Sequence, residues 1–264
     1  ADSFILNYTV SDLDSDSIFS YLDVDSDGDG CRDVIEAGFT DLDNDNIIDG
    51  LSPITFDEQG RVNGTSDGFT RPNSDYSTGA PILINTPFVD VAFCETSTST
   101  ITIDSTADTF QWEVSTDGGT NWTDIIDDTT YNGATTKDLE ISNLQLTLDT
   151  NLYRVFLQRT GNSCDDTSNE ITLTVDPLPI ANTGVEIDYC IVTGDPNPTV
   201  DLTQAENQLS STIGASFQYF TDPAGTDLIS DPVSYPPVGN VLQSVYVKVI
   251  SDKGCARDLV ELVL

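Results

Sequence analysis

The chain has 264 residues and a formal net charge of -36, from 45 acidic and 9 basic residues, with no histidine. Such a charge excludes nucleic acid as a partner, and the missing histidine excludes Ser-His-Asp and Cys-His catalysis and histidine-ligated zinc. No apolar run could span a bilayer, so we predict no membrane insertion, and no acid pair is singled out by its setting, so we predict that the chain is not an enzyme.

An acidic stretch near the N-terminus has the ligand spacing of a calcium loop. In residues 25–36, DSDGDGCRDVIE, carboxylates stand at loop positions 1, 3, 5, 9 and 12, and glycine stands at position 6. Alternate residues of a curling loop can face one centre, and calcium takes about six to eight oxygen ligands. The predicted ligands are Asp25, Asp27, Asp29, the Cys31 carbonyl, Asp33 and Glu36.

Two flanking loops repeat this pattern, so the sequence predicts about three calcium ions. The first loop would use Asp12, Asp14, Asp16, the Ile18 carbonyl, Ser20 and Asp23, and the third Asp41, Asp43, Asp45, the Ile47 carbonyl and Asp49. Position 6 is Ser17 in the first loop, which suits a left-handed turn less well than the Asn46 of the third. The third loop has Ser52 at position 12, so Asp57 or Glu58 is expected to close it. A disordered acidic linker is the alternative.

From about residue 88 the pattern changes to short alternating segments typical of antiparallel strands. They are STITIDST (99–106), TFQWEVST (109–116), LYRVFLQR (152–159) and NEITLTVD (169–176), separated by turn signals. Trp112 stands where an immunoglobulin-like sandwich buries a tryptophan, and Tyr153 stands at the start of a later strand, as in a tyrosine corner. We therefore predict an immunoglobulin-like sandwich over 88–176, with Trp112 in its core. Trp112, Trp122 and Tyr131 could alternatively form a sugar-binding platform.

A proline-containing linker, DPLPIAN, separates a last segment, 177–264, from the middle one. Its expected elements are a strand and helical turn over 198–209 and strands over 215–222, 243–251 and 257–264. The predicted fold is thus mainly β: a calcium-loop module over 1–87, with its core at 9–60, followed by two antiparallel immunoglobulin-like β-sandwiches over 88–176 and 177–264.

Each predicted sandwich contains one cysteine near its start and one near its final hairpin. Their matching placement predicts the disulfides Cys94–Cys164 and Cys190–Cys255, and with them an oxidising, extracytoplasmic location. Cys31 is then left over as a buried free thiol whose functional atom is its carbonyl oxygen.

Two resemblances bear on function. YLDVDSDGDGCRDVIEAG and its neighbours resemble thrombospondin type 3 repeats over about residues 9–60, and the string from FQWEVSTDGGTNWTDI to LYRV resembles immunoglobulin-like repeats of large Bacteroidota surface proteins. The resemblance implies that the chain is part of a longer type IX-secreted adhesin, such as those used in gliding motility. It also implies that Ser105 and Thr129, in short Asp-Ser/Thr-Thr sequences, carry O-linked glycans.

The function expected from these observations is that of a calcium-stiffened stalk segment at the cell surface. Its partners would be neighbouring domains of the same chain, surface polysaccharide, or outer-membrane secretion and motility machinery. Two alternatives stay open at this point. One is a ligand-binding module for carbohydrate or protein, and the other is an accessory region of a secreted polysaccharide-degrading enzyme.

Overall fold

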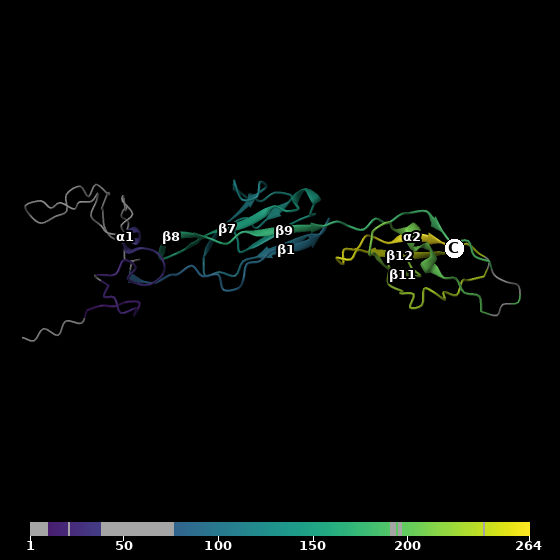
Figure 1. Cartoon of the computed structure of the whole chain (residues 1–264), viewed down its shortest axis with the longest axis horizontal. Helices are drawn as coiled ribbons and strands as arrows, with labels where there is room; N and C mark the ends of the chain where they lie inside the picture. The colour runs from purple at the N-terminus through teal and green to yellow at the C-terminus, as the bar shows by residue number, and fades with distance from the viewer. Residues whose placement is uncertain (1–9, 21, 38–76, 191–193, 195–196, 240) are drawn as a thin grey trace, which may run out of the picture. The chain divides into compact units, whose positions relative to one another are not determined.

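The structure is a computed structural model and describes residues 10–20, 22–37, 77–190, 194, 197–239 and 241–264. The chain divides into two compact units, the first drawing on Ala1–Val91, Thr98–Ser142 and Thr150–Leu173. The second draws on Ala92–Ser97, Asn143–Asp149 and Thr174–Leu264. Strands outnumber helices among the described residues, which confirms the prediction of a mainly β protein (Figure 1).

Two sheets between residues 91 and 176 have the division of an immunoglobulin-like sandwich. The larger sheet has the order β1-β9-β7-β3-β4, with β8 also paired to β7, and the smaller has the order β2-β6-β5. In immunoglobulin terms these are the strand sets A′GFCC′ and BED, which confirms the immunoglobulin-like character of this segment. The larger sheet contains β1 (Val91–Cys94), β3 (Thr109–Ser115), β4 (Thr123–Asp124), β7 (Leu152–Arg159), β8 (Asn162–Thr167) and β9 (Ile171–Asp176). The smaller contains β2 (Ser99–Thr102), β5 (Tyr131–Asn132) and β6 (Asp138–Ile141).

The alternating sequence pattern produces the core of this sandwich. Tyr153, Val155 and Leu157 alternate along β7 and are fully buried, because successive side chains of a strand point to opposite faces. Trp112 on β3 is also fully buried, and its indole N–H donates a hydrogen bond to the Thr136 carbonyl at 2.7 Å. The hydroxyls of Tyr131 on β5 and Tyr153 on β7 lie 3.0 Å apart, which joins the two facing sheets. The predicted core position of Trp112 is confirmed.

In the described part of the last segment, four strands form one sheet with the order β10-β13-β12-β11. β10 pairs with β13 in parallel, whereas β12 is antiparallel to both of its neighbours. The strands are β10 (Val185–Glu186), β11 (Ser216–Phe220), β12 (Ser244–Ile250) and β13 (Val260–Val263).

A short helical layer covers this sheet. For the described residues, the prediction of a second antiparallel sandwich over 177–264 is therefore corrected. The layer consists of η3 (Leu202–Ala205) and α2 (Glu206–Leu209). Leu202, Ala205 and Leu209 recur at helical spacing, so one face of this layer is apolar. That face is buried in one core together with side chains of the sheet, namely Tyr219, Val245, Val247 and Leu262. The same core also contains an antiparallel bridge between Val200 and Tyr235, so a helical layer and this short bridge face the sheet among the described residues.

The disulfides differ from the predicted pairs. Cys31 is bonded to Cys164 and Cys94 to Cys255, with Cα–Cα distances of 5.5 Å in both, while Cys190 is free and exposed. The predicted pairs Cys94–Cys164 and Cys190–Cys255 are wrong, as is the expected free thiol at Cys31. The prediction assumed that each sandwich closes on itself, whereas each hairpin cysteine is bonded to a cysteine of an earlier segment.

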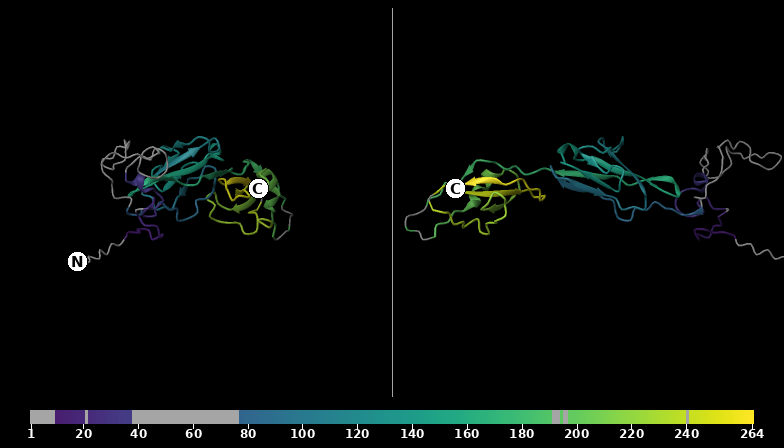
Figure 2. Two further views of the ribbon diagram at one scale, coloured as in Figure 1. Left: turned by 60° about the vertical axis from the view of Figure 1, so that its left-hand side comes forward. Right: turned by 180° about the vertical axis from the view of Figure 1, so that it is seen from behind.

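The first of these bonds fastens the acidic N-terminal segment to the sandwich. Cys31 precedes α1 (Asp33–Glu36), and Cys164 lies in β8 of the larger sheet. α1 lies beside the β8 end of that sheet in both Figure 1 and Figure 2. The second bond joins the last residue of β1 to the loop between β12 and β13.

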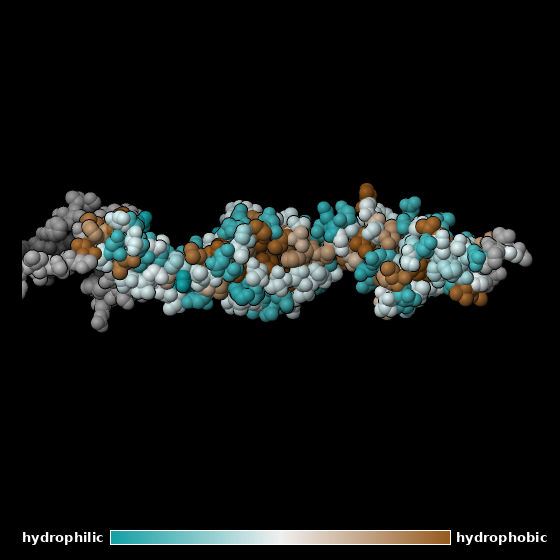
Figure 3. Space-filling view, turned by 90° about the horizontal axis from the view of Figure 1, so that it is seen from below, coloured by the Kyte–Doolittle hydropathy of each residue, from teal (hydrophilic) through white to brown (hydrophobic). Residues whose placement is uncertain are grey.

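Among the described residues, no helix has the length and hydrophobicity needed to span a membrane. On the face drawn in Figure 3, hydrophobic side chains form separate patches among hydrophilic ones. Of the large hydrophobic residues that the structure describes, the most exposed are Ile213, Leu242, Ile126 and Val238.

Candidate metal centre

The first two acidic loops curl in the same way. Ser15 and Ser17, at positions 4 and 6 of the first loop, have φ values of 66° and 81°. Gly28 and Gly30, at the same positions of the second loop, have φ values of 69° and 94°. Left-handed residues at positions 4 and 6 turn the chain sharply, so that the intervening carboxylates face inward. Ser17 therefore adopts the backbone conformation that its residue type disfavours.

The same hydrogen bonds hold both loops. The position-6 N–H donates to the position-1 carboxylate, from Ser17 to Asp12 at 3.3 Å and from Gly30 to Asp25 at 3.2 Å. The position-7 N–H donates to the position-5 carboxylate in both loops, at 2.7 Å in the first and 2.9 Å in the second. The two loops are thus repeats in structure as well as in sequence.

Each loop gathers three carboxylates at positions 1, 3 and 5. One oxygen from each of Asp12, Asp14 and Asp16 lies within 4.8 Å of the others, and the same holds for Asp25, Asp27 and Asp29. Like charges at this separation repel one another, so a cation between them would stabilise the loop. Clusters of oxygen ligands are the chemistry that calcium and magnesium prefer.

Several carboxylate oxygens of these loops are buried without a hydrogen-bond partner. In both loops the orphaned atoms include Oδ1 of the position-1 aspartate and carboxylate oxygens of the position-12 residue. Among the described residues of this region, the orphaned atoms are Asp12 Oδ1, Asp23 Oδ2, Asp25 Oδ1, both oxygens of Asp27 and both oxygens of Glu36. A buried acceptor without a partner costs free energy, so these atoms fit a bound cation.

Among these residues, Glu36 gives the strongest indication of a cation site. Its side chain is fully buried although it closes the second loop from the last position of α1. Burial, followed by the charges of Asp29, Asp27, Asp33 and Asp25, raises the pKa of Glu36 to about 8. Burial also raises the pKa values of Asp25 and Asp27. Positive charge at this position would reverse each of these shifts.

The predicted position-9 ligands, Asp33 and Ser20, accept hydrogen bonds from the neighbouring turns. Both oxygens of Asp33 accept hydrogen bonds from Ser26, from its N–H at 2.7 Å and from its hydroxyl at 2.5 Å. The Ser20 hydroxyl accepts from the Leu13 N–H at 3.3 Å. These contacts brace the turns beside the carboxylate clusters. The side chain of Ile18 is exposed, and Cys31, at position 7 of the second loop, contributes its sulfur to the disulfide.

The third predicted loop, with Asp41, Asp43, Asp45, Ile47 and Asp49, lies outside the described residues. The same is true of Asp57 and Glu58. The predicted third ion therefore stays a prediction, as does the identification of the whole segment as thrombospondin type 3-like.

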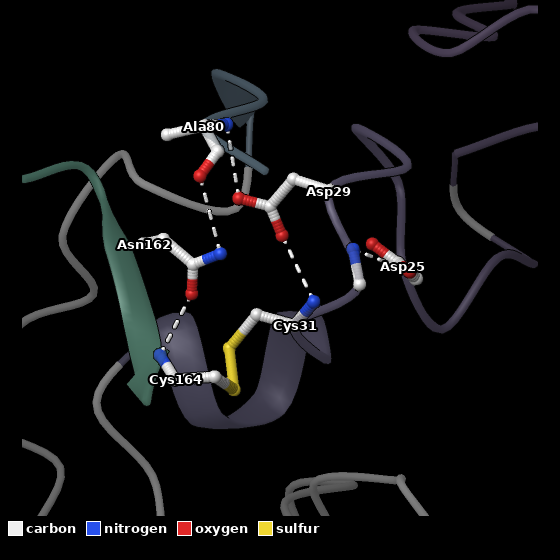
Figure 4. The surroundings of a disulfide bond; sticks show 7 residues. Asp25, Asp29, Cys31, Ala80, Asn162 and Cys164 are labelled. Atoms are coloured by element: carbon white, nitrogen blue, oxygen red, sulfur yellow. Dashed lines mark hydrogen bonds between the residues drawn. A yellow bond between two sulfur atoms is a disulfide. The ribbon is translucent and has the colours of Figure 1, made fainter. Parts of the chain in front are cut away.

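The second loop is anchored on the sandwich by contacts that the sequence did not reveal (Figure 4). Asp29 accepts hydrogen bonds from the Cys31 N–H and, at 3.0 Å, from the Ala80 N–H. Asn162 bridges the same region, because its side-chain amide donates to the Ala80 carbonyl and its side-chain oxygen accepts from the Cys164 N–H. Ala80 and Asn162 carry no charge or spacing signal from which these roles could have been predicted.

The two loops also lie against each other. A Cβ atom placed on Gly28 would lie 2.9 Å from both Cβ and Oδ2 of Asp14. Gly28 thus permits the second loop to approach a carboxylate of the first. The two clusters are therefore expected to respond to a cation together.

The predicted glycosylation sites lie in the sandwich. Ser105 is half-buried, and its hydroxyl accepts a hydrogen bond from the Ala107 N–H at 3.2 Å, whereas Thr129 is exposed. O-glycosylation of both stays a prediction.

One family model and several solved structures match parts of the chain. The family described as "Domain of unknown function (DUF8696)" matches residues 86–177. Among solved structures, the chain is similar to the four N-terminal immunoglobulin domains of Dscam1 isoform 4.44, at 13% identity and a TM-score of 0.34. This match covers 69% of the chain and 45% of the Dscam1 structure, so the chain spans less than half of that structure's length.

Two single-domain structures are also similar. They are domain D1 of Duf (Kirre), at 14% identity and a TM-score of 0.29, and titin domain M7, at 18% identity and a TM-score of 0.28. Each match covers 36% of the chain, and 97% and 93% of the respective structure. A search of the curated proteins finds no match. The immunoglobulin-like character of residues 91–176 rests on the chain's own strand order and on the buried Trp112 and Tyr153.

Proposed function

We propose that this chain is a structural segment of a secreted surface protein, in which calcium fixes the acidic N-terminal loops onto an immunoglobulin-like sandwich. The observation that carries the proposal is Glu36, whose two carboxylate oxygens are fully buried without a partner beside four aspartates. A protein of net charge -36 gains nothing from burying a further carboxylate unless a cation accompanies it.

Calcium would act by supplying charge and ligand contacts at once. In each loop the orphaned position-1 and position-12 oxygens would coordinate the ion, and its charge would cancel the repulsion among the clustered carboxylates. Because no ordered site forms from an unfolded acidic chain, the free energy of binding becomes free energy of folding for these loops. The loops would then be ordered when calcium is bound and loosened when it is removed.

The contacts of Asp29 and Cys31 would transmit this order to the sandwich. Asp29 is a member of the second carboxylate cluster and also accepts the Ala80 N–H, while Cys31 is bonded to β8. Ordering of the second loop by calcium therefore restricts the segment that enters the sandwich. This coupling is the physical basis for a stiffening role.

The finer assignment rests on resemblance to thrombospondin type 3 repeats and to the immunoglobulin-like repeats of Bacteroidota adhesins. We propose a segment of a type IX-secreted, gliding-motility-type adhesin, at the cell surface. The disulfide-bonded, immunoglobulin-like sandwich supports an extracellular location. Neighbouring domains of the longer chain, and the secretion and motility machinery, are its proposed partners.

The aromatic side chains do not favour the alternative of a sugar-binding platform. Trp112 is in the core, and the hydroxyl of Tyr131 contacts that of Tyr153. The Trp122 ring lies 4.2 Å from the guanidinium carbon of Arg154, which covers it in a cation–π contact.

Calorimetric calcium titration of the full chain tests the proposal. Wild type should bind calcium at about 0.1–1 mM, the range of extracellular modules. Glu36→Gln, which keeps the shape of the side chain but removes its charge, should weaken binding at the second loop. Asp124→Asn, an exposed aspartate of β4, is the matched control and should bind as wild type does. If wild type binds no calcium, or if both variants titrate alike, the proposal is wrong.

A further inference from the structure

The four-stranded sheet repeats the strand order of the sandwich. The larger sheet of the sandwich contains the run β1-β9-β7-β3, and the later sheet has the order β10-β13-β12-β11. β7 and β12 are both central strands with alternating buried residues, and each is antiparallel to the strands on both sides. β1 therefore corresponds to β10, and the hairpin that follows β7 corresponds to the hairpin that follows β12.

The cysteines follow this correspondence. Cys164 and Cys255 occupy the two corresponding hairpins, since Cys164 lies in β8 and Cys255 lies between β12 and β13. Each hairpin cysteine is bonded to a cysteine that lies earlier in the chain, Cys164 to Cys31 and Cys255 to Cys94. Cys94 is the last residue of β1, beside the end of β9, because the adjacent Glu95 N–H donates to the Asp176 carbonyl at 2.8 Å.

Cys190 occupies the corresponding region beside the four-stranded sheet. β10 pairs with the end of β13, and the Ile187 N–H donates to the Val263 carbonyl at 2.9 Å. Cys190 lies three residues after Ile187. Because β10 is parallel to β13, the chain approaches Cys190 in the direction in which β13 runs. It is exposed and is the one cysteine among the described residues without a disulfide partner.

A shallow hollow of about 350 Å³ lies beside the segment that leads to Cys190, and it is lined by Ile187, Asp188, Tyr189, Val241, Leu242 and Leu264. Two of these side chains, Val241 and Leu242, are apolar and exposed, at 58% and 86%. A domain docked at Cys190 would cover Val241 and Leu242, and burial of these two apolar side chains would favour the contact.

We propose that Cys190 is an attachment site for the hairpin cysteine of a further immunoglobulin-like domain. The bond would repeat the relationship of Cys94 to Cys255, so that disulfides staple successive domains. The evidence is the internal precedent of two bonded hairpin cysteines, together with the exposed side chains of Val241 and Leu242 in the hollow beside the segment that leads to the unbonded thiol. This inference does not depend on calcium.

The bond would form by thiol–disulfide exchange with a small-molecule or oxidoreductase disulfide as oxidant. The Cys190 thiolate attacks one sulfur of that disulfide, which releases the other sulfur as a thiolate. The hairpin thiolate then attacks the Cys190 sulfur and releases the second thiolate of the oxidant. Two thiols of the protein lose two protons and two electrons, and the oxidant gains them as two thiols.

A tandem chain tests the proposal. A second copy of residues 177–264 is appended after Leu264, directly or through three or four added Ser/Gly residues. This range of linker lengths is used because Cys190 lies four residues beyond Glu186, the last paired residue of β10. After oxidative refolding and thiol blocking, non-reducing peptide mapping should find Cys190 of the first copy bonded to Cys255 of the appended copy. Cys190→Ser in the first copy should leave that Cys255 alkylated, while Cys94 stays bonded to the original Cys255.

The proposal is overturned if Cys190 is alkylated in every linker version although the appended copy resists protease. It is also overturned if Cys190 pairs with Cys190 of a second molecule. The same mapping on protein isolated from its natural source decides the question if the appended copy does not fold. There, Cys190 should be bonded to a peptide from another domain, and a blocked free thiol at Cys190 contradicts the inference.

Discussion

Asp29 accepts a hydrogen bond from the main-chain N–H of Ala80 at 3.0 Å, across 51 residues of sequence. One carboxylate thus belongs both to an acidic cluster and to the point where the chain enters the sandwich. Two residues later, Cys31 forms the disulfide to Cys164. The second loop is therefore tied to the sandwich by a covalent bond and by a residue whose charge a cation would balance.

The Cys31–Cys164 bond should be a major source of stability for the first unit. It closes a loop of 133 residues, and the chain-entropy account gives about 5 kcal/mol for such a loop. The double variant Cys31→Ala/Cys164→Ala should lower the free energy of unfolding by up to this amount in a denaturant titration. Cys190→Ser, which breaks no bond of the structure, is the control and should unfold as wild type does. Equal midpoints for all three proteins would show that this bond contributes nothing.

Calcium affinity should rise with pH because Glu36 must lose its proton to bind. Without calcium, its pKa is raised from 4.5 to about 8 in the folded chain. Without calcium, protonation of Glu36 therefore stabilises the folded chain fully below pH 4.5, and this stabilisation is lost as the pH rises through about 8. Calcium, in contrast, binds the ionised form of Glu36. Between pH 6 and pH 8 the affinity should increase by about tenfold per pH unit, and the increase should be smaller in Glu36→Gln. A pH-independent affinity in wild type would show that Glu36 is not a ligand.

Gly28→Ala should disturb both acidic loops. Gly28 has a φ of 69°, and a Cβ atom would clash with Asp14, whereas Gly118 has a similar φ of 73° with open space around it. Each substitution introduces about 1–2 kcal/mol of backbone strain. Calorimetry should therefore show weaker calcium binding in Gly28→Ala only, with Gly118→Ala as the matched control. If both variants bind calcium as wild type does, the two loops do not depend on their close approach.

Tyr153→Phe should lower the stability of the sandwich by about 1 kcal/mol, because it removes the hydroxyl contact with Tyr131 between the two sheets. Tyr246→Phe, on the half-exposed face of β12, serves as the control. Denaturant titrations of both variants measure the effect. A loss equal to that of the control would mean that the contact between the two hydroxyls adds nothing to stability.

The sandwich strands and the second acidic loop were predictable because their signals are local. Alternation in LYRVFLQR places Tyr153, Val155 and Leu157 on one face, and the spacing from Asp25 to Glu36 brings carboxylates together in one turn of chain. The left-handed conformation of Ser17 was less predictable. It goes with the hydrogen bond from its N–H to Asp12, whereas the conformational preference of serine alone disfavours it.

The disulfide pairing was not predictable because it depends on which segments are neighbours in space. Cys164 and Cys255 lie 133 and 161 residues from their partners, and nothing in their local sequence identifies those partners. The helical layer that covers the four-stranded sheet could be predicted only in part from the sequence. The apolar residues of 198–209 indicated a strand and a helical turn, but not that the strand would be reduced to a bridge and that the turn would cover the sheet.

Hydrogen exchange of the full chain, with calcium and with a chelator, tests the calcium-dependent order of the acidic segment most directly. The account predicts that amides of residues 22–37 lose protection when calcium is removed, while those of β3 and β7 keep theirs. In Glu36→Gln the response of residues 22–37 should be reduced, and in Asp124→Asn it should match wild type. If residues 22–37 of the wild-type chain show the same protection in calcium and in chelator, calcium does not order this segment, and the stiffening role is contradicted.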